Sequence, residues 1–199
     1  MTTFTSILGW ALAVVSAVSI WPQAARSWRL RSVQGLSTSA VASASSTMIV
    51  WLFYTYAVVD VPAWMATAAA LLALLVVLQV MVNIQQRGAR RIVGLLLAVL
   101  ALSWWAYSAG YGYQLGWIAG VGSALWTLPQ LRTALTQADL RGVSVPAFAL
   151  VAVESLGWVV YGLLTGSPSY LIGPSVQIPS TTIIAVRAWR SHRSQTAHR

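Results

Sequence analysis

Glu154 is the acidic residue that the sequence places near the middle of a long apolar segment. An ionised acid at the bilayer centre costs about 2.5–3.5 kcal/mol, and such a residue is by default a functional candidate. Its carboxyl could be protonated and bind solute hydroxyls, carry a coupling proton, or neutralise a cationic solute. It could instead be a structural acid bonded to a hydroxyl such as that of Ser43 or Thr47.

Two aromatic stripes extend this candidate site. Trp158 and Tyr161 follow Glu154 by four and seven residues, which places the three side chains on one helix face. The same spacing occurs 107 residues earlier, in a stripe of Thr47, Trp51 and Tyr54. Two tryptophan faces at equal depth suit the apolar face of a sugar, or a cation. The alternative is that these rings face lipid or the membrane interface.

Gln177 lies between two prolines, Pro174 and Pro179, in the last apolar segment. A broken backbone inside a membrane is tolerated only where it is buried in protein or lines a cavity. Gln177 could bind a solute or satisfy the carbonyls that the prolines free. Its counterpart in the first half of the chain is Ala70, so the polar site is expected to be weighted to the second half. The predicted substrate-binding residues are Trp51, Trp158, Glu154, Gln177, Thr47, Ser43 and Ser175.

The offset of 107 residues that relates the two stripes runs through much of the chain without a gap. It relates Ile20-Trp21-Pro22-Gln23 to Thr127-Leu128-Pro129-Gln130. It also relates Gly9, Gly35 and Ser37 to Gly116, Gly142 and Ser144. Such self-similarity indicates a duplicated structural unit. The function is therefore expected to lie between the two copies.

Composition assigns the chain to the membrane proteins. Hydrophobic residues make up 58% of it and charged residues 8%, with a mean hydropathy of +0.72. Soluble domains carry about a quarter charged residues. The net charge of +9 does not indicate nucleic-acid binding, because the arginines stand at the ends of apolar runs. There is no cysteine, both histidines lie in the polar tail, and no enzyme motif occurs, so we expect neither catalysis nor a cofactor or metal.

Seven segments approach the roughly 20 apolar residues that a membrane span needs. They are Thr5–Ala25, Thr38–Val59, Pro62–Val82, Ile92–Ser108, Tyr113–Leu131, Val145–Leu164 and Ser169–Trp189. All twelve arginines fall in the first, third and fifth loops between these spans or at the C-terminal end. By the positive-inside rule, the N-terminus is expected outside and the C-terminus in the cytoplasm of a multi-pass plasma (inner) membrane protein.

The odd fourth span has a role in this arrangement. A copy of three spans that was fused directly would be inverted, and one further crossing restores its orientation. We therefore predict an all-α membrane fold of 3+1+3 spans. Its parts are a first triple-helix bundle at 1–87, a linker helix at 88–110, a second bundle at 111–190 and a cytoplasmic tail at 191–199.

Prolines mark the predicted cytoplasmic ends of the bundles. Pro22 and Pro129 lie near the ends of the first and fifth spans, and Pro146 starts the sixth, where the first copy has Ser39. A proline removes a backbone hydrogen bond, so these points can act as hinges of a gate that also includes Gln23 and Gln130. The alternative is that the prolines only start or end helices.

With these features the chain resembles the PQ-loop repeat family, and within it the SWEET-type sugar transporters. The resemblance rests on the two Pro-Gln pairs, the turns Gly35-Leu36-Ser37 and Gly142-Val143-Ser144, and the linker span. It implies two bundles with spans ordered 1-3-2, alternating access, hinge prolines and a tryptophan in the second and sixth spans. The asparagines of that family's third and seventh spans are absent. The last span offers Pro174, Ser175 and Gln177 instead, and the third offers Thr67 and alanines.

Three functions follow as hypotheses. The first is a transporter of a small polar solute, a sugar before others, that works by alternating access. The second is a proton-coupled carrier of an amino acid or cationic metabolite that uses Glu154, because related PQ-loop proteins export amino acids with protons. The third is a transport-inactive membrane receptor. The expected partners are a small-molecule substrate and the lipid bilayer, and nucleic acid is not expected. An oligomer is compatible with all three functions.

Overall fold

The computed structural model describes residues 3–84 and 88–196, and its regular elements in these ranges are all α-helices. Arg87 lies outside the described residues. The helices are α1 Thr3–Ser19, α2 Trp21–Leu30, α3 Thr38–Ala57, α4 Val61–Asn83, α5 Ala89–Ser108, α6 Gly112–Leu125, α7 Thr127–Thr136, α8 Val145–Thr165 and α9 Ser169–Thr196. This architecture confirms the predicted all-α membrane class.

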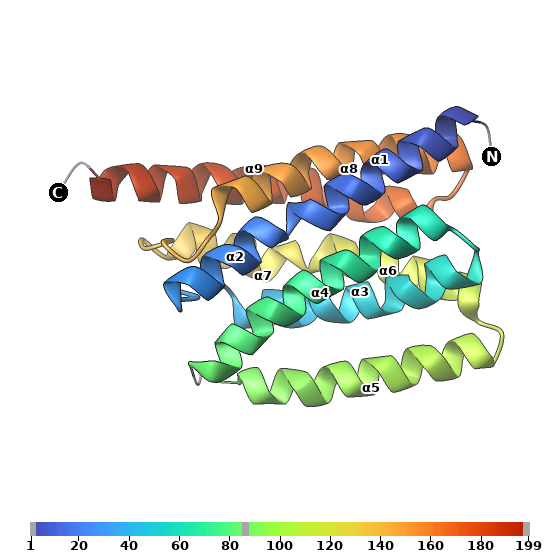
Figure 1. Ribbon diagram of the computed structural model, residues 1–199, viewed down its shortest axis with the longest axis horizontal. Helices are drawn as coiled ribbons and strands as arrows, with labels where there is room; N and C mark the ends of the chain where they lie inside the picture. Colours follow the sequence, from blue (N-terminus) through green and yellow to red (C-terminus); the bar gives the residue numbers. More distant parts are fainter. Residues whose placement is uncertain (1–2, 85–87, 197–199) are drawn as a thin grey trace.

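Four stretches of the described chain are long and apolar enough to cross a membrane. They are Thr3–Leu30, Val61–Asn83, Arg91–Ser108 and Val145–Thr165. The other three predicted spans are helical too, but they fall short by length or composition. Several serines and threonines lower the hydropathy of α3 and α9. Helix α6 has only 14 residues, because it ends at Leu125 and the chain continues in α7. These helices run alongside the first four (Figure 1).

The helices run roughly side by side and alternate in direction, so the N- and C-termini lie at opposite ends (Figure 1). Helices α2, α7 and α9 all end on the same side, where α3, α5 and α8 begin. This side carries the arginines of the described chain and is called the arginine end. The opposite side, where α3 ends and α4 begins, is called the aspartate end after Asp60.

The spans form two groups of three around a shared interface. Helix α4 packs between α1–α2 and α3, and α9 packs between α6–α7 and α8. The groups meet where α3 contacts α6 and where α1 contacts α8. Because the repeat relates α1 to α6 and α3 to α8, these two contacts are pseudo-symmetric. Helix α5 lies outside both groups, mainly against α3 (Figure 1).

The first span of each group is broken near its Pro-Gln pair. Ile20 separates α1 from α2, and Trp126 separates α6 from α7. Pro22 falls in the first turn of α2, where the missing N–H costs nothing, and Pro129 falls in the first turn of α7. In contrast, Pro174 and Pro179 lie inside α9 without ending it.

Two repeated glycines allow the groups to approach closely. A Cβ on Gly116 would lie 2.5 Å from Cε2 of Tyr54, and one on Gly9 would lie 3.0 Å from Cε2 of Tyr161. Each glycine therefore accommodates a tyrosine ring of the other group. This explains why the Gly9 and Gly116 positions are the same in both copies.

Substitution of Gly116 by alanine should destabilise the protein, because the new methyl group would press on the buried Tyr54 ring. Overpacking of this kind costs about 1–3 kcal/mol. The measurement is thermal unfolding in detergent. Gly94→Ala on α5 is the control, since a Cβ there meets nothing within 4 Å. Equal midpoints for the two variants would contradict the close approach of Tyr54.

Candidate functional site

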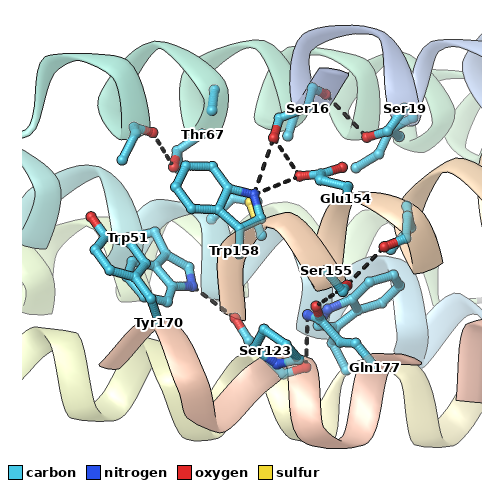
Figure 2. A pocket seen from close by; sticks show the side chains of 18 residues that line it. Ser16, Ser19, Trp51, Thr67, Ser123, Glu154, Ser155, Trp158, Tyr170 and Gln177 are labelled. Atoms are coloured by element: carbon cyan, nitrogen blue, oxygen red, sulfur yellow. Dashed lines mark hydrogen bonds between the residues drawn. The ribbon is translucent and has the colours of Figure 1, made fainter. Parts of the chain in front are cut away.

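A central cavity of about 100 Å³ lies between the two groups of helices. Its aromatic walls are Trp51, Trp126, Trp158 and Tyr170. Its polar lining includes Glu154, Gln177, Thr67 and the serines Ser16, Ser19, Ser123 and Ser155 (Figure 2). Glu154 is the one carboxylic acid among these described lining residues. None of them is an arginine, lysine or histidine, so its carboxyl has no basic counterpart there.

Glu154 bonds to the opposite group of helices. Its Oε1 atom accepts hydrogen bonds from the Ser16 hydroxyl of α1 and from Nε1 of Trp158, the latter at 3.0 Å (Figure 2). The sequence-based alternative of a bond to Ser43 or Thr47 on α3 is therefore not what the structure has. The carboxyl lies at the cavity wall, with one oxygen engaged by two donors.

Both predicted tryptophans bond across the interface. Nε1 of Trp51 donates to Oγ of Ser123 at 2.7 Å, and Nε1 of Trp158 donates to Oγ of Ser16 at 3.3 Å. The repeat relates the two tryptophans to each other and also Ser16 to Ser123. The bonds are thus one contact made twice, from each group to the other.

Tyr170 is a member of the site that sequence reasoning missed. Its ring stacks on Trp51, with centroids 5.2 Å apart, and on Trp158, with centroids 5.4 Å apart. The two tryptophans therefore meet through this tyrosine and not directly. The repeat gives no signal for it, because its counterpart in the first copy is Ala63.

Asp60 bridges the groups at the aspartate end. It is 5% exposed and caps α4 by accepting from the Ala63 amide. Its carboxylate also accepts from the hydroxyl of Tyr170 at 2.7 Å and from that of Tyr161 at 3.1 Å. Sequence reasoning missed this acid because it stands between two spans.

A second bond at the aspartate end mirrors the first. The hydroxyls of Tyr54 and Ser167 share a hydrogen bond of 2.9 Å. The repeat relates Tyr54 to Tyr161 and Ser167 to Asp60. The bonds of Tyr54 and Tyr161 are therefore a repeated pair that runs from each group to the other, and the bond of Tyr170 to Asp60 is a third between the groups.

At the arginine end, each glutamine of a Pro-Gln pair holds the turn of the other copy. Gln23 accepts from the Ser144 amide at 2.7 Å and donates to the Gly142 carbonyl at 2.9 Å. We call these bonds, together with their counterparts, the glutamine clasp. The counterparts run from Gln130, which accepts from the amide of Ser37 and donates to the carbonyl of Gly35, both at 2.8 Å.

Gln177 joins α9 to α6 and α8. Its Nε2 donates to the Ser123 carbonyl and its Oε1 accepts from the Ser155 hydroxyl, each at 3.0 Å (Figure 2). The carbonyls that Pro174, Pro179 and Pro129 free belong to other residues. Gln177 therefore does not serve the proline breaks and instead fixes the cavity wall beside the end of α6.

The remaining predicted residues lie away from the cavity. Thr47 is buried against α6, where a Cβ on Gly122 would lie 2.7 Å from its Oγ1. Ser175 is exposed and donates to the Ile172 carbonyl. Ser43 and Ser39 line a separate groove near Pro129. Of the seven predicted binding residues, the structure gathers Trp51, Trp158, Glu154 and Gln177 around the cavity.

The predicted hinge residue Pro146 lies in the first turn of α8. This helix begins at the Ser144 cap, whose hydroxyl accepts from the Ala147 amide and whose own amide binds Gln23. Pro146 thus lies in the first turn of a helix that begins beside the glutamine clasp. This position is compatible with a hinge and also with a proline that only starts the helix.

Loss of Gln130 should loosen the arginine end. Gln130→Ala leaves the part-buried Ser37 amide and the buried Gly35 carbonyl without this partner, at a cost of about 1–3 kcal/mol. The readout is thiol labelling of Ala40→Cys, since Ala40 is buried near the clasp and the chain has no other cysteine. Labelling should quicken by about fivefold or more, as expected for that cost. Gln79→Ala, on the exposed face of α4, is the control, and equal rates in both variants would disprove the clasp.

Comparison with known proteins adds one finding. Residues 4–64 match the family model of the PQ loop repeat, over the stretch that holds α1, α2, α3 and the start of α4. The match includes Pro22 and Gln23, and the second copy lies outside it. This match supports the resemblance to the PQ-loop family, a multi-pass membrane location and a function of the transporter or carrier kind. A search of curated proteins finds no match.

Proposed function

We propose that this chain is a membrane carrier that moves a small polar solute by alternating access, with the central cavity as the solute site. The observation that carries the proposal is the paired arrangement of the bonds between the two groups of helices. They bridge the interface on both sides of one cavity, through the glutamine clasp at one end and through Asp60 and Ser167 at the other.

Alternating access then follows from breaking one set of bonds at a time. Separation at the arginine end frees Gln23 and Gln130 from the opposite turns. The helix interruptions at Ile20 and Trp126 are the points at which the first and fifth spans bend. Separation at the aspartate end frees Asp60 from Tyr161 and Tyr170. In this proposed cycle, the state in which both sets are formed is the occluded state.

The lining supports a hydroxylated solute such as a sugar. Glu154, Gln177 and Thr67 offer hydrogen-bonding groups beside aromatic rings, and this mixture suits a molecule with polar edges and apolar faces. Tyr170 stacks on both tryptophans in the occluded arrangement. Because its hydroxyl is bound to Asp60, opening of the aspartate end would release the ring and uncover the tryptophan faces to the solute.

A second candidate rests on Glu154. The acid lines the cavity without a basic partner among the described lining residues, and aromatic rings surround it. A carboxyl in such a place takes up either a proton or a cation, and aromatic faces strengthen cation binding. A proton-coupled carrier of an amino acid or cationic metabolite would use the acid in this way.

Uptake into proteoliposomes separates these candidates. The panel pairs neutral sugars with amino acids and small amines, each with and without a proton gradient. Sugar uptake that ignores the gradient supports the first function, and gradient-driven uptake of the others supports the second. A panel in which no solute moves would contradict a carrier and favour the membrane receptor.

Glu154→Gln sharpens this test. If Glu154 carries the proton or binds the cation, gradient-driven uptake should fall by about tenfold or more, because a hydrogen bond to a charged group is worth about 1.5–3 kcal/mol. Asp139→Asn is the matched control, since this acid pairs with Arg141 in an exposed turn. Gradient-driven uptake that survives in Glu154→Gln would remove this residue from the coupling.

A further inference from the structure

Trp126 lies at the interruption of the fifth span. It is the residue between α6 and α7, and its backbone amide closes the last turn of α6 on the Gly122 carbonyl at 2.9 Å. Its side chain is 8% exposed and packs with Ala44, Leu74 and Val151. Any bend of the fifth span at its break would therefore move this ring.

The ring also lies between two cavities. A second cavity of about 50 Å³, lined mostly by apolar residues, extends to Gln23 and Gln130 of the glutamine clasp. Three residues line both this cavity and the central one, namely Ile20, Trp126 and Val151. Ile20 and Trp126 are the break residues of the two spans that carry the Pro-Gln pairs. A solute that left the central cavity toward the clasp would have to pass this partition.

The indole N–H of Trp126 has no hydrogen-bond partner in the described part of the chain, although its nitrogen is fully buried. The other two cavity tryptophans differ, since Trp51 donates to Ser123 and Trp158 donates to Ser16 and Glu154. A buried donor without a partner disfavours the arrangement that buries it. Movement of the ring on opening would offer this N–H to water or to a solute acceptor, so the penalty applies to the occluded state.

We propose that Trp126 is a positioning residue of the solute path, an inference that rests on the carrier function proposed above. Its ring separates the central cavity from the glutamine clasp, and its unpaired N–H shifts the equilibrium away from the occluded state toward opening at the arginine end. The two roles belong to different parts of the side chain, so different substitutions separate them.

The test uses the absence of native cysteine. Ala66→Cys places one thiol in the central cavity, where Ala66 is buried in the lining. The probe is a small, membrane-impermeant methanethiosulfonate, applied to vesicles from one face at a time. The labelling rate from the face of the arginine end reports passage through the partition, and it needs no knowledge of the natural solute.

Two variants should change this rate in opposite directions. Trp126→Ala removes the ring, so labelling from the arginine end should quicken by about tenfold or more. Trp126→Phe keeps the ring but removes the unpaired donor, so labelling should slow by about threefold or more. Trp117→Phe, which changes an exposed tryptophan inside α6, should leave the rate unchanged.

The outcomes distinguish this inference from the proposed function. Unchanged rates in both Trp126 variants, or a similar acceleration in both, would overturn the role of Trp126 and leave the carrier function standing. A thiol at position 66 that is labelled from neither face in the otherwise unaltered protein would overturn the carrier function and the inference with it. If Trp126→Ala fails to fold, the conservative Trp126→Phe still decides, because only slower labelling supports the proposal.

Discussion

The interface between the two groups of helices depends on polar bonds that each group makes to the other. Gln23 and Gln130 bind opposite turns, and Trp51 and Trp158 bind opposite serines. Apolar surface alone holds helices together weakly in a bilayer, because lipid chains compete for it, so hydrogen bonds and close packing decide which helices associate. In this protein the repeat makes the glutamine and the tryptophan bonds twice. An interface of this kind can be held at both ends and still be opened at one.

The chemistry of the cavity departs from this symmetry. Glu154, Tyr170 and Gln177 belong to the second copy, and the equivalent positions of the first copy are Thr47, Ala63 and Ala70. The glutamine clasp and the bonds of Tyr54 and Tyr161, in contrast, recur in both copies. Symmetric contacts therefore hold the two groups together, and unequal residues give the cavity its carboxyl group and its polar wall.

Sequence alone predicted the features that follow from period and composition. Helical class came from the apolar runs, and the common end of both Pro-Gln pairs came from the spans and the arginines. The stripe spacing also selected Trp51, Trp158 and Glu154, which line the cavity. Trp51 and Trp158 are counterparts of each other in the two copies, which is why the repeat identified them readily.

What sequence reasoning missed depends on tertiary packing. Thr47 packs against Gly122 of α6 and not into the cavity, and no local pattern of the sequence fixes that contact. Tyr170 faces both tryptophans because α9 packs between α6 and α8, whereas its counterpart is an alanine. The serine pair of Ser16 and Ser123 was detectable, since the offset preserves it, but serines are too common in such spans to stand out.

The central claim is that the two ends of the interface open in turn around one cavity. Paired spin labels measure this directly, because the chain has no cysteine to remove. One pair, on Leu30 and Gln137, spans the arginine end, and another, on Val61 and Leu164, spans the aspartate end, all at exposed positions. The account predicts that conditions which lengthen one distance leave the other short. Distances that lengthen together, or that never change, would contradict it.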